Sequence, residues 1–326
     1  MPHATFPRIV YMGTPDFAVE PLKEILESGY NVSAVVTVPD KPAGRGLKFK
    51  PSPVKTFAQE KNLPILQPSK LKDPDFINEL KKINPDIIVV VAFRMLPKEV
   101  WQLPKIGTFN LHASLLPQYR GAAPINWAII NGETQTGVTT FLLDEQIDTG
   151  NILLQEVVPI SEDETAGELH DKLMLVGSKL VVETINLLAK GDYKPIPQSQ
   201  ISVEGEIKSA PKIFKETCKI DWDSPVSKIY NHIRGLSPYP AAWSELKIKK
   251  GDVESTTSIK IYTAEKTNFH PSAKPGTIAT DHKSFINVNC SDGVLSLKRI
   301  QVAGKKAMNV DEFLRGLNNT ELIEML

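Results

Sequence analysis

The chain has 326 residues, a mass of 36.1 kDa and 38 acidic against 38 Lys and Arg side chains. Its 41% hydrophobic and 23% charged residues are typical of a soluble globular protein, and the length favours two domains. No apolar run approaches the ~20 residues of a membrane span, the N-terminus does not resemble a secretory signal, and two cysteines are too few for a disulfide framework or a metal cluster. We therefore expect a cytoplasmic protein with no membrane span and no bound metal.

The first part of the chain alternates predicted strands with predicted helices. Short runs rich in apolar and β-branched residues predict strands at 8–13, 31–38, 86–93, 108–112, 136–143 and 152–158, of which the first is expected to be buried. Helices are predicted from a turn at 14–17 to 28–29, and at 73–82, 123–130 and 164–189. This alternation indicates an α/β domain with a Rossmann-like, doubly wound, mostly parallel sheet over residues 1–190. The single glycine in Gly13-Thr-Pro-Asp-Phe lacks the spacing of a dinucleotide site, which disfavours a nicotinamide oxidoreductase.

A basic segment, residues 41–55, separates the second predicted strand from the next helix. It contains no acidic residue and five basic ones, Lys41, Arg45, Lys48, Lys50 and Lys55. Its glycines and prolines predict no regular structure. Such a loop can neutralise phosphates of a nucleic acid, but a merely solvated loop has the same composition, so the residues alone leave both interpretations open.

The pattern changes after residue 190. Residues 191–211 are rich in proline and polar side chains and are predicted to be a linker. Residues 212–326 carry a predicted helix at 225–234 and short strands at 242–246, 258–263, 285–289 and 294–301, which indicates a small β-barrel domain. From residue 206 onward, 18 basic residues exceed 14 acidic ones. This mild excess fits contact with a polyanion and fits a solvated lysine surface equally well.

The most informative run is residues 110–124, Asn-Leu-His-Ala-Ser-Leu-Leu-Pro-Gln-Tyr-Arg-Gly-Ala-Ala-Pro. Asn110 and His112 are two residues apart on a predicted strand, so their side chains project from the same face. Asp148 follows on another loop, in Asp-Glu-Gln-Ile-Asp-Thr-Gly. A carboxamide, an imidazole and a carboxylate together suit acyl transfer to an amine. Each residue alone has a structural explanation, and the joint pattern favours catalysis.

This pattern resembles the signature of the folate-dependent formyltransferases. The resemblance rests on Asn110, His112, the Ser114-Leu115-Leu116-Pro117 segment, Arg120-Gly121, Pro124 and Asp148. It implies that Asn110, His112 and Asp148 catalyse formyl transfer from the co-substrate 10-formyltetrahydrofolate. Asn110 would donate a hydrogen bond to the formyl oxygen. His112 would stabilise that oxygen or relay a proton from the amine to N10, and Asp148 would set the imidazole tautomer and favour its protonated form.

The same resemblance implies a folate-binding region. The turn Phe93-Arg94-Met95-Leu96 would line the pterin pocket, and Ser114, Leu115, Leu116 and Pro117 would contact folate through their backbone. This chain departs from many relatives in a shorter turn with Arg94 in place of glycine. Arg94 either meets a folate carboxylate or is only a turn residue, and the sequence leaves both open.

The acceptor is implied by the basic segment and by the C-terminal domain. The basic segment resembles the tRNA-contacting loop of the family branch that acts on initiator methionyl-tRNA. The resemblance lies in its sequence, Lys-Pro-Ala-Gly-Arg-Gly…Pro-Ser-Pro-Val-Lys. Arg45 would then contact the acceptor stem, supported by Lys41, Lys48 and Lys50. Residues 221–243 resemble the start of the OB-like tRNA-binding domain in that branch. Members of the family are usually monomeric, so the resemblance implies a monomer.

Two other functions stay in view. A formyltransferase acting on a nucleotide sugar or another small amine would share the run from Asn110 to His112 and a helix like Pro124-Ile-Asn-Trp127, but is not expected to carry the basic segment. A non-catalytic RNA-binding protein would tolerate loss of His112 and Asp148 without a change in affinity. It would also show no folate-dependent activity.

Overall fold

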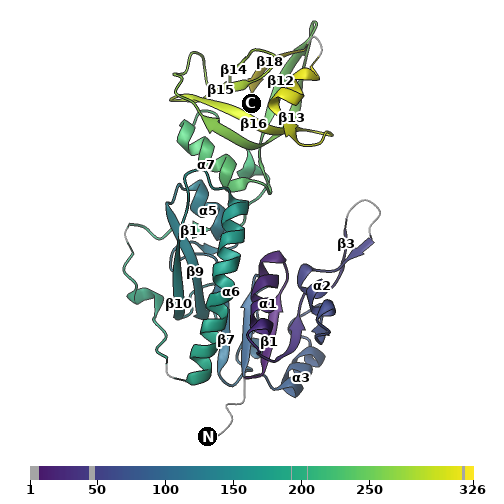
Figure 1. Cartoon of the computed structure of the whole chain (residues 1–326), viewed down its shortest axis with the longest axis vertical. Helices are drawn as coiled ribbons and strands as arrows, with labels where there is room; N and C mark the ends of the chain where they lie inside the picture. The colour runs from purple at the N-terminus through teal and green to yellow at the C-terminus, as the bar shows by residue number, and fades with distance from the viewer. Residues whose placement is uncertain (1–6, 44–47, 192, 204, 318–319) are drawn as a thin grey trace. The chain divides into compact units, whose positions relative to one another are not determined.

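The computed structural model describes residues 7–43, 48–191, 193–203, 205–317 and 320–326. Contacts divide the chain into two units (Figure 1). The N-terminal unit contains the described residues up to Gly121, with Thr136–Pro159 and His170–Ala210. The C-terminal unit contains Ala122–Gln135, Ile160–Leu169 and Pro211–Leu326. Two short parts of the predicted N-terminal domain, Ala122–Gln135 and Ile160–Leu169, therefore belong to the second unit, which no hydrophobic periodicity would predict. The domain boundaries given above remain a prediction.

A seven-stranded sheet with the order β10-β9-β7-β6-β1-β2-β5 forms the centre of the N-terminal unit. These strands are β1 (Ile9–Gly13), β2 (Val32–Val36), β5 (Ile65–Leu66), β6 (Ile87–Val91), β7 (Gly107–His112), β9 (Gln135–Leu142) and β10 (Ile152–Pro159). The strands from β5 to β7 run parallel, and β9 runs antiparallel to β7. The expected mostly parallel, Rossmann-like sheet is confirmed, with β9 and β10 as neighbours on either side of the Asp148 loop.

Helices cover both faces of this sheet. They are α1 (Val19–Glu27), α2 (Pro53–Glu60), α3 (Pro74–Ile83), α4 (Lys98–Trp101) and α6 (Ala166–Lys190), with a 3-10 turn η1 (Asp16–Ala18). One face packs Val10, Met12, Ile88 and Val90 against residues of α3 and α4. On the other face, α6 lies close to β7, because a Cβ at Gly177 would meet Leu111. Figure 1 shows α1 and α6 side by side in front of the strands.

The basic segment is more regular than its composition indicates. Strands β3 (Lys41–Ala43) and β4 (Lys48–Lys50) pair antiparallel, and α2 starts directly after them. Ser52 caps this helix by accepting a hydrogen bond from the Lys55 N–H at 3.1 Å, and Pro53 occupies its first turn. A serine followed by proline is a standard helix start. The prediction of an irregular segment was wrong because the prolines were taken as breakers only.

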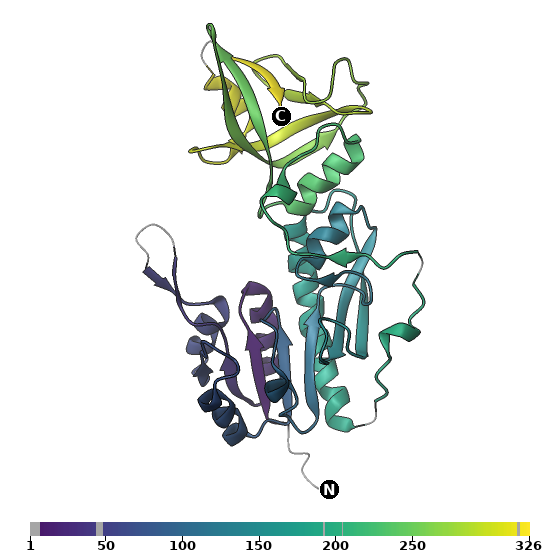
Figure 2. The same ribbon diagram turned by 180° about the vertical axis from the view of Figure 1, so that it is seen from behind.

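The C-terminal unit is built on an antiparallel sheet ordered β14-β15-β16-β13-β12-β18, with β17 paired to β16. Its strands are β12 (Ala242–Lys250), β13 (Val253–Lys266), β14 (Ile278–Thr280), β15 (Ile286–Asn289), β16 (Val294–Val302), β17 (Met308–Asn309) and β18 (Thr320–Met325). A bridge between Thr277 and Glu324 joins the ends of this order, so the sheet is a nearly closed barrel, as expected. Figure 2 shows this barrel from behind.

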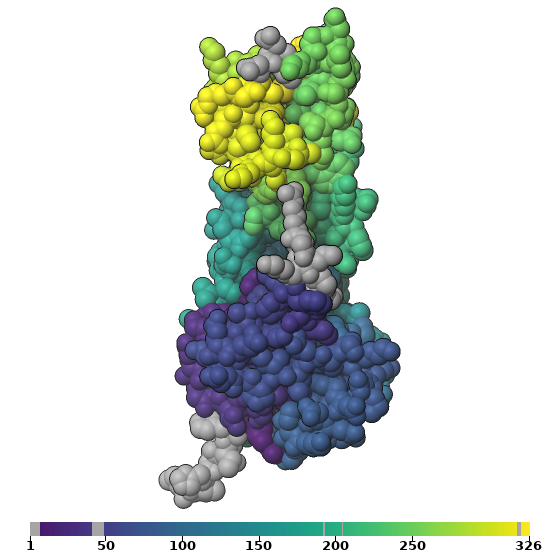
Figure 3. All heavy atoms as spheres, turned by 90° about the vertical axis from the view of Figure 1, so that its right-hand side faces the viewer, coloured from purple at the N-terminus to yellow at the C-terminus, as the bar shows by residue number. Residues whose placement is uncertain are grey.

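Three helices and a short turn complete this unit. They are α5 (Pro124–Ile130), α7 (Val226–Leu236), α8 (Val310–Arg315) and the 3-10 turn η3 (Glu216–Cys218). Buried residues of α7, such as Ile229 and Ile233, pack in one cluster with Leu246, Ile261 and Leu297 of the barrel. In the space-filling view the green and yellow segments of this unit form one packed body (Figure 3).

The described residues of the predicted linker include regular structure that pairs with the N-terminal unit. It contains η2 (Gln198–Gln200) and β11 (Ser209–Ala210), and β11 pairs in parallel with β8 (Arg120–Gly121). Ile196 and Ile152 exchange backbone hydrogen bonds of 2.8 Å. This segment therefore returns to the run 110–124 that the sequence marks as the candidate site.

Candidate active site

Strand β7 places Asn110 and His112 on one face of the sheet, as the two-residue spacing predicts. Asn110 is in register with Val90 of β6, and Val90 belongs to the cluster that packs on α3 and α4. Both polar side chains therefore lie on that side of the sheet. Asn110 is half-buried, and its side-chain amide has no hydrogen-bond partner among the described residues. A half-buried carboxamide without a partner is available to a ligand.

His112 is held by a backbone carbonyl. Its side chain is 8% exposed, and Nε2 lies 2.9 Å from the carbonyl oxygen of Tyr119. A carbonyl only accepts hydrogen bonds, so Nε2 carries the proton and donates. In the neutral ring Nδ1 then has a free lone pair. Nδ1 lies 3.9 Å from Oδ2 of Asp148, which is within reach of an ion pair but too long for a hydrogen bond.

Asp148 approaches His112 from the loop between β9 and β10. Asp144 braces this loop, because Oδ1 accepts hydrogen bonds from the Gln146 N–H at 2.9 Å and the Thr149 hydroxyl at 2.8 Å. Asp148 itself has a left-handed backbone, with φ of 56°, and its Oδ2 accepts a hydrogen bond of 3.0 Å from the Gly121 N–H. The structure thus brings Asn110, His112 and Asp148 into one region. The tautomer of His112 is set by Tyr119, however, and not by Asp148 as the resemblance implies.

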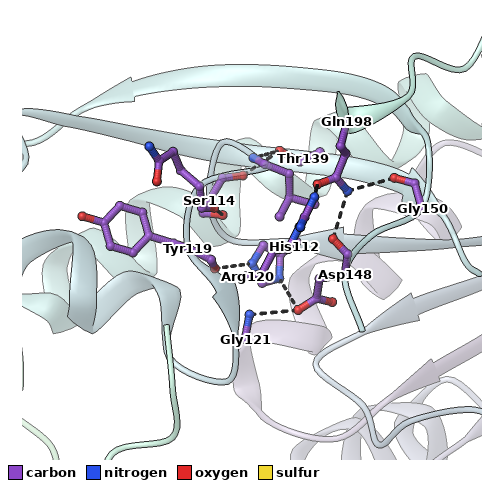
Figure 4. Close-up of polar contacts among 11 residues, drawn as sticks. His112, Ser114, Tyr119, Arg120, Gly121, Thr139, Asp148, Gly150 and Gln198 are labelled. Atoms are coloured by element: carbon purple, nitrogen blue, oxygen red, sulfur yellow. Dashed lines mark hydrogen bonds and ion pairs between the residues drawn. The ribbon is translucent and has the colours of Figure 1, made fainter. Parts of the chain in front are cut away.

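Gln198 is a site residue that the sequence interpretation missed. It is 5% exposed, and its Nε2 donates to the carbonyls of Asp148 and Gly150, both at 2.9 Å. Its Oε1 accepts from Nε and Nη2 of Arg120, at 3.0 and 2.6 Å. Figure 4 shows Gln198 between the Asp148 loop and Arg120. The residue lies in a proline-rich polar stretch, where no local pattern distinguishes it from a solvated glutamine.

The segment from Ser114 to Pro117 lies mainly in the protein interior. Ser114, Leu116 and Pro117 are buried, and Leu115 is half-buried. Backbone groups of this segment are already used: the carbonyl of Ser114 accepts from the Thr139 hydroxyl at 2.6 Å, and the carbonyl of Leu116 accepts from Nε2 of Gln155 at 2.9 Å. These contacts favour a supporting role over a direct contact to folate through those carbonyls.

The turn after β6 lies at the same edge of the sheet as the end of β7, because the two strands are parallel neighbours. Met95 is 67% exposed and Phe93 is half-buried, whereas Leu96 packs in the core. The guanidinium of Arg94 donates to the carbonyls of Pro68 and Ser69, and burial lowers its pKa. Of the two interpretations of Arg94, the structure favours the turn residue that ties two loops together.

The structure describes only part of the basic hairpin, which consists of the paired strands β3 and β4. Lys41 and Lys48 supply backbone to the pair β3–β4, and Lys50 is exposed. Arg45 lies outside the described residues. Lys55 forms an ion pair with Asp40, with Nζ 2.6 Å from Oδ2, and this partner lowers the pKa of the Asp40 carboxyl. Lys55 therefore anchors the base of the hairpin.

Comparison with known proteins identifies the family. Residues 7–185 match the model described as formyl transferase, and residues 212–318 match that described as formyl transferase, C-terminal domain. This chain belongs to the formyl transferase family. It is 55% identical over 318 residues to the methionyl-tRNA formyltransferase of Bacteroides thetaiotaomicron, covering 98% of each chain. It is 48% identical over 311 residues to that of Porphyromonas gingivalis, covering 95% of each.

Solved structures show the same fold for this formyl transferase. The sugar 3N-formyl transferase WlaRD superimposes with a TM-score of 0.64 at 21% identity, covering 93% of this chain and 100% of that one. HypX from Aquifex aeolicus in complex with tetrahydrofolic acid gives a TM-score of 0.62 at 19% identity, covering 96% of this chain and 48% of that one. Within the described residues, no helix of this formyl transferase combines the length and apolar character that a membrane span requires.

Proposed function

We propose that this protein transfers the formyl group of 10-formyltetrahydrofolate to the α-amino group of initiator methionyl-tRNA. The chemistry is supported by one observation, the unpartnered amide of Asn110 on the same face of β7 as His112, whose Nδ1 lies 3.9 Å from Asp148. The acceptor is supported by relatives that are named methionyl-tRNA formyltransferase and match almost the full chain. We further propose that the protein acts in the cytoplasm as a monomer.

Asn110 is suited to stabilise developing negative charge. When an amine attacks a formyl carbon, negative charge grows on the formyl oxygen. The carboxamide N–H of Asn110 would donate to that oxygen. Because this amide has no partner among the described residues, it can do so without first breaking a protein hydrogen bond. A donor of this kind typically contributes about 2.7–4 kcal/mol to the barrier.

His112 is suited to move a proton through Nδ1. Its Nε2 keeps a proton on the Tyr119 carbonyl, so Nδ1 is the nitrogen with a free lone pair. Nδ1 would accept a proton from the attacking amine and return it to the departing nitrogen, which balances the reaction. The ring is positively charged between these two steps, and the carboxylate of Asp148, 3.9 Å from Nδ1, stabilises that charge. Such acid–base help is typically worth about 10²–10⁴-fold in rate.

The residues present fit a folate co-substrate. When bound, 10-formyltetrahydrofolate supplies a formyl carbon on a nitrogen leaving group. The exposed Met95 and the half-buried Phe93 offer an apolar surface at the sheet edge where β7 ends, and the Asn110 amide offers a donor. In this proposal Phe93 and Met95 hold the pterin, and Arg94 fixes their turn through Pro68 and Ser69. A structure of the same fold, HypX from Aquifex aeolicus, contains tetrahydrofolic acid, which supports a folate co-substrate for this fold.

The tRNA would be bound by the basic hairpin and the C-terminal barrel. Lys41, Arg45, Lys48 and Lys50 would neutralise phosphates of the acceptor end. Lys50 is exposed and available for this purpose. The hairpin follows strand β2, which is separated from β7 in the sheet by β6 and β1. The ion pair between Lys55 and Asp40 fixes the base of the hairpin. A fixed base would present the cationic strands in a defined direction.

A direct assay tests the function. Purified protein is mixed with 10-formyltetrahydrofolate and either charged initiator tRNA, elongator methionyl-tRNA or a nucleotide-linked amino sugar. We expect formylmethionine on the initiator tRNA and much slower formylation of the other two. Formylation of the sugar in preference to the tRNA would support the alternative that the sugar formyltransferase fold suggests. No formylation of any acceptor, by protein that is folded, would refute both.

A further inference from the structure

Residues 196–203 and 205–210, which we call the strap, lie along the candidate site. Backbone hydrogen bonds attach both ends of the strap to the N-terminal unit. Ile196 forms a bridge with Ile152 at one end, and β11 pairs with β8 at the other. Between these ends it makes three contacts that lead directly to the partners of His112 and Asp148. None of these contacts is expected of a linker.

The first contact is made by Gln198. Its amide N–H groups hold the carbonyls of Asp148 and Gly150, which fixes the backbone of the Asp148 loop. Its oxygen receives two hydrogen bonds from Arg120. All these polar atoms lie around a side chain that is 5% exposed, so water cannot easily replace them. Gln198 therefore joins the loop that carries Asp148 to Arg120, which lies between the two residues that hydrogen-bond His112 and Asp148 (Figure 4).

The second contact passes through Tyr119. The Tyr119 N–H donates to the carbonyl of Lys208 at 2.7 Å, while the Tyr119 carbonyl accepts from His112. The side chain of Gln118 adds to this attachment, since its Oε1 accepts from the Lys208 N–H at 2.7 Å and its Nε2 donates to the Glu206 carbonyl at 3.1 Å. The position of the carbonyl that sets the tautomer of His112 is thus fixed by the strap.

The third contact is a close approach at Gly121. Gly121 pairs with Ala210 in the β8–β11 ladder, and a Cβ at Gly121 would collide with the carbonyl oxygen of Ala210. The Gly121 N–H is the donor to Oδ2 of Asp148. Gly121 has φ of 128°, a backbone conformation that side chains of L-residues rarely adopt. The position of the Gly121 N–H, and with it that of the Asp148 carboxylate, therefore depends on where the strap lies.

We propose that the strap positions His112 and Asp148 for catalysis, with Gln198 as its main positioning residue. The strap holds the group that Nε2 of His112 donates to, the group that donates to Asp148, and the backbone of Asp148 itself. It touches neither Nδ1 of His112 nor the Asn110 amide in any described contact. This proposal rests on the proposed function in one respect, because its effect on kcat is measured as the rate of formyl transfer.

The test uses the full-length protein with Gln198→Glu. This change keeps the size of the side chain and an acceptor for Arg120, but replaces two donors with a carboxylate that faces the carbonyls of Asp148 and Gly150. Gln200→Glu is the matched control, because Gln200 lies in the same turn η2 and is exposed. Gln118→Leu is the second variant, since it removes the side-chain attachment to Glu206 and Lys208 without touching Gln198.

Two measurements are made on each variant. We expect Gln198→Glu to lower kcat by about 10–10²-fold, with the KM for tRNA and for folate changed by less than about threefold. The second measurement needs no substrate: a nitrogen–proton correlation spectrum of the imidazoles, with the His112 signals assigned from His112→Asn. We expect His112 of the wild type to carry its proton on Nε2 and the variant to show a mixture of tautomers. Gln118→Leu should shift both properties in the same direction, and Gln200→Glu should shift neither.

The outcomes separate the two proposals. If the wild type formylates no acceptor, the proposed function fails, while a changed His112 tautomer in Gln198→Glu would still support the strap. If the wild type is active and both strap variants, shown to be folded by circular dichroism, keep the wild-type kcat and tautomer, the strap proposal is refuted. If Gln198→Glu does not fold, the result for Gln118→Leu decides.

Discussion

Nδ1 of His112 lies 3.9 Å from Oδ2 of Asp148, and both residues find their hydrogen-bond partners in one short segment: His112 donates to the Tyr119 carbonyl, and Asp148 accepts from the Gly121 N–H. The pair is therefore organised by backbone groups two residues apart. The carboxylate is left to act on the imidazole through its charge. This arrangement separates the structural contact of Asp148 from the catalytic role that we propose for its charge.

The variant Asp148→Asn tests that separation. The amide oxygen of asparagine can still accept from the Gly121 N–H, so we expect thermal unfolding close to that of the wild type. The negative charge beside Nδ1 is lost, and we expect kcat to fall by about 10²-fold or more. Steady-state formylation and thermal unfolding measure the two effects. Glu156→Gln, at an exposed position of β10, is the control for loss of an acidic charge. An Asp148→Asn enzyme with wild-type kcat would show that the charge is not used.

The variant Asn110→Ala removes the proposed donor to the formyl oxygen. We expect kcat to fall by about 10²–10³-fold, as for other donors of this type. Since the Asn110 amide has no partner among the described residues, its removal should leave the free energy of unfolding almost unchanged. Single-turnover formylation and urea denaturation measure these quantities. A large loss of stability with little loss of rate would assign Asn110 to the core instead.

The sequence predicts the parts of this protein whose information is local. The strands around Val10, Val35 and Val89 are short, mainly apolar runs, and the last of them is β-branched throughout, while β7 carries its candidate pair at a spacing of two. The short elements α4 and β5 were not predicted, because four and two residues show no periodicity. The candidates Asn110, His112 and Asp148 were found because their residue types and order match a known family pattern. The sequence alone does not show how close their side chains lie in the folded protein.

The contacts of Gln198 could not be predicted for a physical reason. A proline-rich polar segment is typical of a linker, and its order here comes from backbone pairing with β8, which is a tertiary property. The same reason applies to Tyr119, whose carbonyl sets the tautomer of His112 although nothing in its side chain indicates this. Sequence indicates the candidate reacting groups, whereas the contacts that would orient them depend on how distant segments pack together.

Gly121→Ala is expected to weaken both stability and activity. The new Cβ would collide with the Ala210 carbonyl, and the φ of 128° is strained for alanine. We expect the free energy of unfolding to fall by about 1–3 kcal/mol. Denaturant titration measures it. Gly205→Ala is a useful comparison, because its φ is also positive, at 76°, but no atom lies within 4 Å of its Cβ position. Equal losses in the two variants would mean that strain alone, and not the contact with the strap, explains the effect.

His232 on α7 predicts a loss of stability in weak acid. Burial lowers its pKa, and its Nε2 is buried with no partner among the described residues. The unfolded chain therefore binds the proton more readily than the folded protein. Stability is fully present above the ordinary histidine pKa of about 6.5 and decreases as the pH falls from there toward the lowered pKa. Thermal unfolding between pH 7.5 and 5 should show this decrease, and His232→Gln should reduce it. An unchanged slope in the variant would assign the decrease to other groups.

The exposed Lys50 predicts a salt-dependent contribution to tRNA binding. If its ammonium contacts a phosphate, Lys50→Ala should raise the KM for methionyl-tRNA and leave kcat unchanged. It should also reduce the slope of log affinity against log salt concentration by about 1, because one fewer counterion is released on binding. Filter binding of charged tRNA across a salt series measures the slope. Lys70→Ala, at another exposed position of the N-terminal unit, is the control for general loss of positive charge. Equal effects of the two substitutions would show that the hairpin attracts RNA only through the overall charge of the protein.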